Sequence, residues 1–93
     1  MARYCPLFSG SSGNCAYIGT PESGILIDAG VSAKRIETAL KDRDIDPRTI
    51  AAIFVTHEHF DPVCGLKILT KRYGMPVFAS PGTLEALVEA GVL

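Results

Sequence analysis

The chain has 93 residues, 47% of them hydrophobic and 20% charged, with nine basic side chains against ten acidic ones. This composition excludes an intrinsically disordered chain, and the length allows one domain. A net charge of −1 gives no support for nucleic-acid binding by bulk charge, although it says nothing about local patches. The sequence has no apolar run of about 18 residues, so no membrane-spanning helix is expected. Three cysteines without a CxxC pair, and no signal-peptide pattern, predict a reduced, cytoplasmic protein.

The first third of the chain predicts a β-meander. We expect strands over residues 3–8 and 15–18, separated by a small polar loop. Proline and glycine at residues 20–24 are typical of a turn. The apolar run over residues 24–28 that follows is typical of a strand buried on both faces.

The rest of the chain alternates helices with strands. Ser32 predicts the start of a helix over residues 33–42, whose apolar positions Ile36, Ala39 and Leu40 form one stripe. Further elements are expected as follows: a second buried strand over residues 51–56, a helix capped by Asp61 with Pro62 first and Gly74 after it, a strand over residues 76–79, and a helix after residues 80–82 marked by Leu84, Leu87 and Val88. The order β-β-β-α-β-α-β-α predicts an α/β fold with a mixed sheet.

Both histidines of the chain, His57 and His59, follow directly on the strand predicted over residues 51–56. In extended backbone, residues 57, 59 and 61 point the same way. Two imidazoles and the Asp61 carboxylate at a strand end suit a divalent metal ion, zinc above all. Two alternatives stay open: the histidines have structural roles, and Asp61 serves only as a helix N-cap.

Residues 56–62 resemble the THxHxDH motif of the metallo-β-lactamase fold. Residues 27–30 resemble the (I/L)DAG strand end of that fold, and residues 9–15 resemble the GSSGNC opening of its YycJ-like bacterial branch. Residues 45–48 and 71–77 also look like this branch. The resemblance therefore covers the whole chain and implies the N-terminal part of an αββα sandwich, with the C-terminal half of the fold absent from residues 1–93.

The resemblance also assigns site residues. It implies that His57 and His59 bind a first metal and that Asp61 binds a second, with Asp61 as the catalytic carboxylate. Zinc is the expected metal, with manganese or iron as alternatives. Asp28 and Thr56 are expected to orient the metal-binding loop, although a plain strand-end turn explains Asp28 equally well.

One position departs from the family pattern. The family has a metal-binding histidine after the aspartate, where this chain has Pro62, whose side chain has no donor atom. Cys64 is conceivable as a substitute ligand, but a partly buried helix cysteine is the simpler interpretation. The remaining family ligands come from later sequence, so we expect the chain alone to be inactive.

Two functions follow from these observations. The first is a fragment of a metal-dependent hydrolase whose metal-activated water attacks an ester or phosphodiester, with nucleic-acid ends as one substrate class. The second is a non-catalytic, degenerate domain that binds one metal or acts as an interaction module. No membrane partner is expected. Half of a two-sheet sandwich should leave an apolar sheet face uncovered, which predicts self-association.

Overall fold

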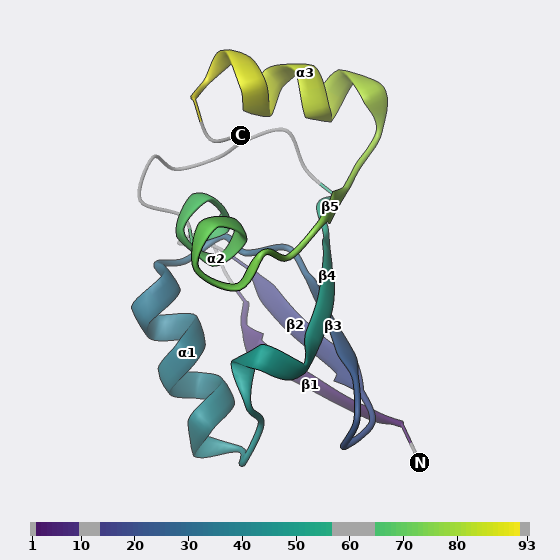
Figure 1. The fold of residues 1–93 in the computed structure, drawn as a ribbon, viewed down its shortest axis with the longest axis vertical. Coiled ribbons are helices and arrows are strands. Elements are labelled where there is room, and N and C mark those ends of the chain that lie inside the picture. Colours follow the sequence, from purple (N-terminus) through teal and green to yellow (C-terminus); the bar gives the residue numbers. More distant parts are fainter. Residues whose placement is uncertain (1, 10–13, 57–64, 92–93) are drawn as a thin grey trace.

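A computed structural model describes residues 2–9, 14–56 and 65–91 (Figure 1). In these ranges five strands form one sheet in the order β1-β2-β3-β4-β5. The strands are β1 (Arg3–Phe8), β2 (Cys15–Gly19), β3 (Gly24–Ile27), β4 (Ile50–Phe54) and β5 (Val77–Phe78). The helices are α1 (Ala33–Asp42), the 3-10 turn η1 (Pro47–Thr49), α2 (Leu66–Tyr73) and α3 (Pro81–Glu89). The predicted α/β class and element order are confirmed.

The sheet is mixed, as predicted. Strands β1, β2 and β3 pair antiparallel, whereas β3 pairs parallel with β4 and β4 with β5. Consequently β1, β3, β4 and β5 all end at one edge of the sheet, where β2 begins. We call this edge, marked by Phe8, Ile27, Phe54 and Phe78, the carboxyl edge. Ligand sites of open α/β sheets lie at such an edge.

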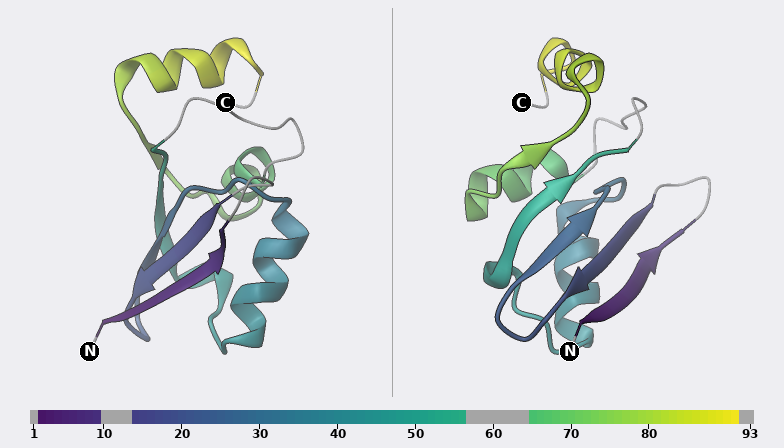
Figure 2. Two further views of the ribbon diagram at one scale, coloured as in Figure 1. Left: turned by 180° about the vertical axis from the view of Figure 1, so that it is seen from behind. Right: turned by 90° about the vertical axis from the view of Figure 1, so that its right-hand side faces the viewer.

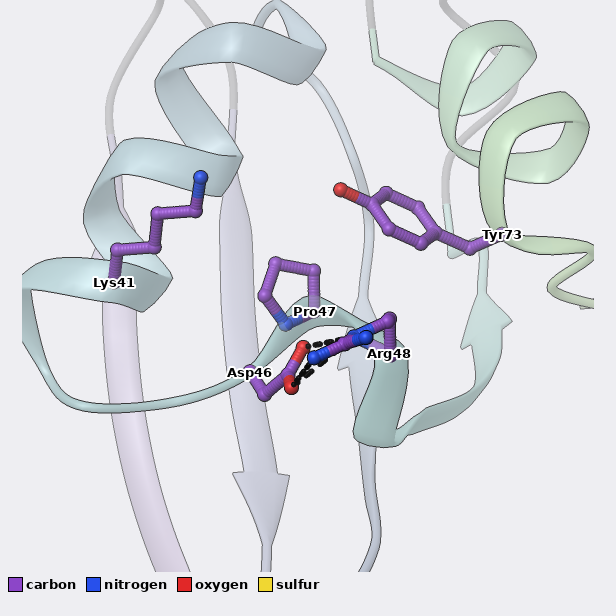
Figure 3. A pocket seen from close by; sticks show the side chains of 5 residues that line it. All are labelled: Lys41, Asp46, Pro47, Arg48 and Tyr73. Atoms are coloured by element: carbon purple, nitrogen blue, oxygen red, sulfur yellow. Dashed lines mark hydrogen bonds and ion pairs between the residues drawn. The ribbon is translucent and has the colours of Figure 1, made fainter.

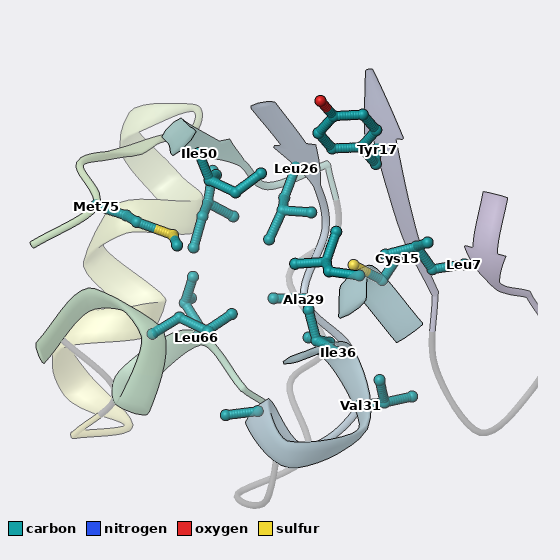
Figure 4. Close-up of a cluster of buried hydrophobic side chains, with 14 of the residues drawn as sticks. Leu7, Cys15, Tyr17, Leu26, Ala29, Val31, Ile36, Ile50, Leu66 and Met75 are labelled. Carbon is teal, nitrogen blue, oxygen red and sulfur yellow. The ribbon is translucent and has the colours of Figure 1, made fainter. Parts of the chain in front are cut away.

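Helices α1 and α2 pack on the same face of the sheet and form the core with it (Figures 1 and 4). Leu26 of β3 and Ile53 of β4 are register partners, and both are fully buried. The apolar stripe predicted for α1 is buried against them, as are Leu66 and Leu69 of α2. No helix in the described ranges is long and apolar enough to cross a membrane.

The opposite face of the sheet corrects one prediction. Strands β3 and β4 were expected to be buried on both faces, but every second residue of β3 is only half-buried, and Phe54 of β4 is 41% exposed. Phe54 stacks on Phe78 of β5, with ring centroids 5.1 Å apart. The view from the side places both α1 and α2 behind the sheet (Figure 2). The helices thus cover one face, and the outer face keeps an apolar surface.

The helix ends agree with the sequence prediction where a capping residue marks them. Helix α1 spans the predicted residues, and the Ser32 hydroxyl accepts from the Arg35 N–H. Gly74 ends α2 in the left-handed conformation, as expected.

Helix α2 begins later than predicted, at Leu66, because the Gly65 N–H bonds to the carbonyls of Ala29 and Val31 instead of entering a helix. In α3, Leu87 is buried but Val88 is 61% exposed, so the stripe predicted there is only partly formed.

Candidate metal centre

Asp28 ties the ends of two strands together at the carboxyl edge. Its backbone N–H donates to the Phe54 carbonyl at 2.7 Å. Its carboxylate accepts from the Thr56 N–H at 2.8 Å and from the Thr56 hydroxyl at 2.6 Å. Three hydrogen bonds therefore join these two stretches, and two of them hold Thr56, the residue that directly precedes His57 in the chain.

The local sequence explains this geometry. The parallel register places Ile27 of β3 beside Phe54 of β4, so the residues that follow the two strands are neighbours. Asp28 leaves the strand with φ 63°, a left-handed conformation that aspartate tolerates better than most residues. This turn ends the strand and directs the carboxylate toward Thr56. Asp28 and Thr56, both expected to orient the metal-binding loop, are in direct contact, and their role around a metal stays a prediction.

A second anchor lies on the same loop. The Gly65 N–H donates to the carbonyls of Ala29 and Val31, at 3.2 and 2.5 Å. The loop is itself fixed to the start of β2, since the Gly30 N–H donates to the Asn14 carbonyl at 2.9 Å. Thr56 and Gly65 flank residues 57–64, so both described neighbours of that segment are attached to one loop. This loop, residues 28–31, is the scaffold of the candidate site.

Gly65 is required by close packing rather than by its backbone angle. A Cβ added there would lie 2.9 Å from the Ala33 nitrogen, at the start of α1. Its φ of −73° is open to any residue. The absence of a side chain therefore lets the start of α2 approach the loop and α1.

The predicted metal ligands His57, His59 and Asp61 lie outside the described residues, as do Pro62 and Cys64. Within the described ranges, no group of three histidine, cysteine, aspartate or glutamate side chains could hold a metal ion. Both Asp28 oxygens accept hydrogen bonds from Thr56, which suits orientation of a loop rather than coordination. The donor chemistry of two imidazoles and a carboxylate, placed directly after Thr56 in sequence, fits zinc.

Cys15 lies under this scaffold at the start of β2. It is 1% exposed. Burial raises the pKa of its thiol to about 12, and the negative charge of Asp28 contributes in the same direction. The thiol therefore stays protonated near neutral pH and acts as a packing residue, not as a nucleophile.

One residue at the carboxyl edge escaped the sequence reasoning. The guanidinium carbon of Arg35, in the first turn of α1, lies 4.7 Å from the centre of the Phe8 ring at the end of β1. No local pattern in the sequence signals this contact, because Phe8 and Arg35 lie on different elements.

A hollow of about 370 Å³ lies at the opposite end of the sheet, before β4 begins (Figure 3). It is lined by Lys41, Asp46, Pro47, Arg48 and Tyr73. Asp46 and Arg48 form an ion pair at 2.9 Å, and the hydrogen bond from Arg48 lowers the pKa of Asp46. Because η1 precedes β4, this hollow lies away from the carboxyl edge and does not belong to the candidate metal centre.

Comparison with known proteins adds independent information. Residues 9–92 match the model of the metallo-beta-lactamase superfamily. The exodeoxyribonuclease YycJ of Bacillus anthracis is 42% identical over 85 residues, which cover 91% of this chain and 32% of that protein. The exodeoxyribonuclease WalJ of Streptococcus pneumoniae serotype 2 is 40% identical, with the same coverage. A metallo-beta-lactamase structure from Cronobacter sakazakii superposes with a TM-score of 0.77 at 27% identity, covering 92% of this chain and 34% of that one.

The exodeoxyribonuclease relatives are much longer than this chain. The chain spans about a third of the length of the curated relatives it matches. The similarity therefore concerns one part of those proteins.

Proposed function

The chain belongs to the metallo-beta-lactamase superfamily, and on that premise we propose that it forms part of a metal-dependent hydrolase that cleaves phosphodiester bonds at DNA ends. The substrate class rests on the identity of 42% to an exodeoxyribonuclease over 85 residues. We include a cytoplasmic location in the proposal, because the free thiols of Cys5 and Cys15 fit a reducing compartment.

One observation of the structure supports this proposal most directly. The Asp28 carboxylate holds Thr56, and Thr56 is followed in sequence by His57 and by the second histidine of the chain. A metal site needs ligands that are oriented before the metal arrives, and carboxylate contacts behind the ligands supply that orientation. The position of this contact at the carboxyl edge agrees with the place of ligand sites in α/β sheets.

The residues of this chain would have the following roles in such a site. His57 and His59 would hold a zinc ion, and Asp61 would contribute a carboxylate to it or to a second ion. A bound metal of this kind lowers the pKa of a water molecule and polarises a phosphoryl oxygen. Asp28 and Thr56 would fix the start of the ligand segment, and the Gly65 contact would fix its other side.

A chimera tests the proposal in a complete fold. The aligned region of the Bacillus anthracis exodeoxyribonuclease would be replaced by the matching residues of this chain, and the release of nucleotides from end-labelled DNA would be measured. We expect hydrolysis that depends on added metal and disappears when His57 and His59 are replaced by alanine. A folded, metal-loaded chimera that leaves DNA intact contradicts the proposal.

Pro62 favours a second candidate function, a non-catalytic domain that binds one metal. Proline replaces the expected histidine and removes a donor from the second metal position. The same chimera distinguishes the two functions: with Pro62→His, the ratio of bound metal to protein should rise. If the proline-containing chimera already binds two metals and hydrolyses DNA, the second candidate is wrong.

A further inference from the structure

The hollow beside Lys41 has walls from three different elements. Lys41 in the last turn of α1 and Tyr73 at the end of α2 point toward each other across it, and the ring of Pro47 in η1 lies below and between them (Figure 3). Its volume of about 370 Å³ falls within the range of ~300–1,000 Å³ that is typical of small-molecule sites. It lies at the end of the sheet opposite the carboxyl edge, so the proposed hydrolase function does not account for it.

The floor of the hollow is held in place by its own hydrogen bonds. The Asp46 carboxylate accepts from the Arg48 N–H at 2.9 Å. The Asp46 carbonyl accepts from the Thr49 N–H at 2.9 Å and from the Thr49 hydroxyl at 2.7 Å. Pro47, between Asp46 and Arg48, is buried and has a φ that its ring fixes. Because these contacts are made within the chain itself, little conformational entropy is lost when a ligand binds to this floor.

Tyr73 forms an aromatic wall whose position is fixed. Its side chain is half-buried and packs against the core. Partial burial raises the pKa of its hydroxyl, and the hydrogen bond to Glu37 of α1 acts in the same direction. The neutral hydroxyl therefore donates to Glu37, and Arg72 pairs with the same carboxylate. Since the ring lines the hollow, a planar ligand can stack on it.

The charged groups that line the hollow favour an anion. Asp46 and Arg48 neutralise each other in an ion pair at 2.9 Å. Lys41 is exposed, and within the described part of the chain it forms no ion pair. Asp42 and Asp44 are close to it in sequence, but the lining does not include them. The lining thus has two cations and one carboxylate, which leaves the charge of the Lys41 ammonium to attract an anionic group.

We propose that this hollow binds a nucleotide, with the base stacked on the Tyr73 ring and the phosphate beside the Lys41 ammonium. A heteroaromatic base matches the flat surfaces of Tyr73 and Pro47, and a phosphate matches the cation opposite them. The Asp46 carboxylate supplies acceptors for the N–H groups of the base. A nucleotide combines a planar ring, N–H donors and an anion in one molecule. The inference goes beyond the proposed function, because the hollow lies away from the carboxyl edge and its lining residues are all described.

An NMR titration measures binding and locates it. The ¹⁵N-labelled chain would be titrated with thymidine 5′-monophosphate in EDTA, which removes free metal ions. We expect saturable shifts of the backbone amide signals of Lys41, Arg48 and Tyr73. Thymidine and inorganic phosphate should each bind about tenfold more weakly, because each supplies only part of the contacts. Shifts at Asp28 and Gly65 instead would place the nucleotide at the carboxyl edge and overturn the inference.

Matched variants separate the two contacts from general effects of charge and folding. Lys41→Ala should weaken the binding of thymidine 5′-monophosphate about twofold to fivefold, as expected for an exposed ion pair. Lys34→Ala removes the same charge from the first turn of the same helix and should leave the affinity unchanged. Tyr73→Leu removes the stacking surface and should weaken binding about tenfold, whereas Tyr73→Phe keeps the ring and should retain the affinity. Urea unfolding of each variant shows whether it is folded.

A free nucleotide and the end of a nucleic-acid strand share this chemistry, and a second probe distinguishes them. If a 5′-phosphorylated tetranucleotide shifts the same amide signals at lower concentration, the site holds a strand end; if only the monophosphate shifts them, it holds a free nucleotide. Equal binding of phosphate alone, equal losses for Lys34→Ala and Lys41→Ala, full affinity of Tyr73→Leu, or no saturable shift would each overturn the inference. None of these outcomes involves hydrolysis, so the failure of this inference and that of the proposed function are separate results.

Discussion

Asp28 affects the free energy of unfolding in two ways, through its hydrogen bonds and through its left-handed backbone conformation. Two different substitutions distinguish these effects. Asp28→Gly deletes both hydrogen bonds to Thr56 but keeps a residue that accepts a φ of 63°. Asp28→Ala deletes the same bonds and adds the cost of a left-handed alanine. Hydrogen bonds to charged groups contribute about 1.5–3 kcal/mol each, and exposure of Thr56 reduces this to about 1 kcal/mol each. The left-handed conformation costs alanine about 1 kcal/mol.

The expected losses in the free energy of unfolding are therefore about 2 kcal/mol for Asp28→Gly and about 3 kcal/mol for Asp28→Ala. In a domain of this size, 2 kcal/mol lowers the Tm by roughly 8–16 °C. Urea unfolding followed by circular dichroism measures both values. Zinc affinity should also fall by about 10–100-fold in either variant, because the residue before His57 loses its anchor.

Asp44 provides the matched control for the backbone contribution. It has a φ of 57° and is exposed. Asp44→Gly should leave stability nearly unchanged, whereas Asp44→Ala should lose about 1 kcal/mol. If Asp28→Gly is as stable as the wild type, the hydrogen bonds to Thr56 contribute nothing and the reasoning is refuted. If Asp28→Gly unfolds normally but binds zinc as the wild type does, the anchoring role is wrong.

Three further expectations concern the metal ligands, the packing and the outer face. Replacing His57 and His59 by alanine should abolish the binding of zinc to the purified chain, measured by atomic emission. An unchanged zinc content would contradict the assignment of these ligands. Gly65→Ala should destabilise the fold by about 1–3 kcal/mol, because its Cβ would meet the Ala33 nitrogen at 2.9 Å. A variant as stable as the wild type would show that the start of α2 can move freely. The chain should self-associate through the outer sheet face, and Phe78→Lys should shift its sedimentation toward the monomer; equal sedimentation of both proteins would contradict this.

The candidate site divides into parts that were readable from the sequence and parts that were not. The family resemblance placed Asp28 and Thr56 near the metal-binding loop, but their hydrogen bonds to each other were not predicted, because the two residues are 28 positions apart. Local patterns carry no information about such a distance. Arg35 escaped notice for a related reason: its partner Phe8 lies on another element, far from it in the sequence.

The sequence by itself determined the order of the elements, the class of the fold, the ends of α1 and the end of α2. These features depend on neighbours within a few residues, as with the Ser32 cap and the helix end at Gly74. Tertiary structure decided where α2 begins, because the Gly65 N–H is taken by the loop of residues 28–31. It also left one sheet face partly exposed, since α1 and α2 both pack on the other face. Hydrogen bonds and packing between distant segments set these features, and no short stretch of sequence encodes them.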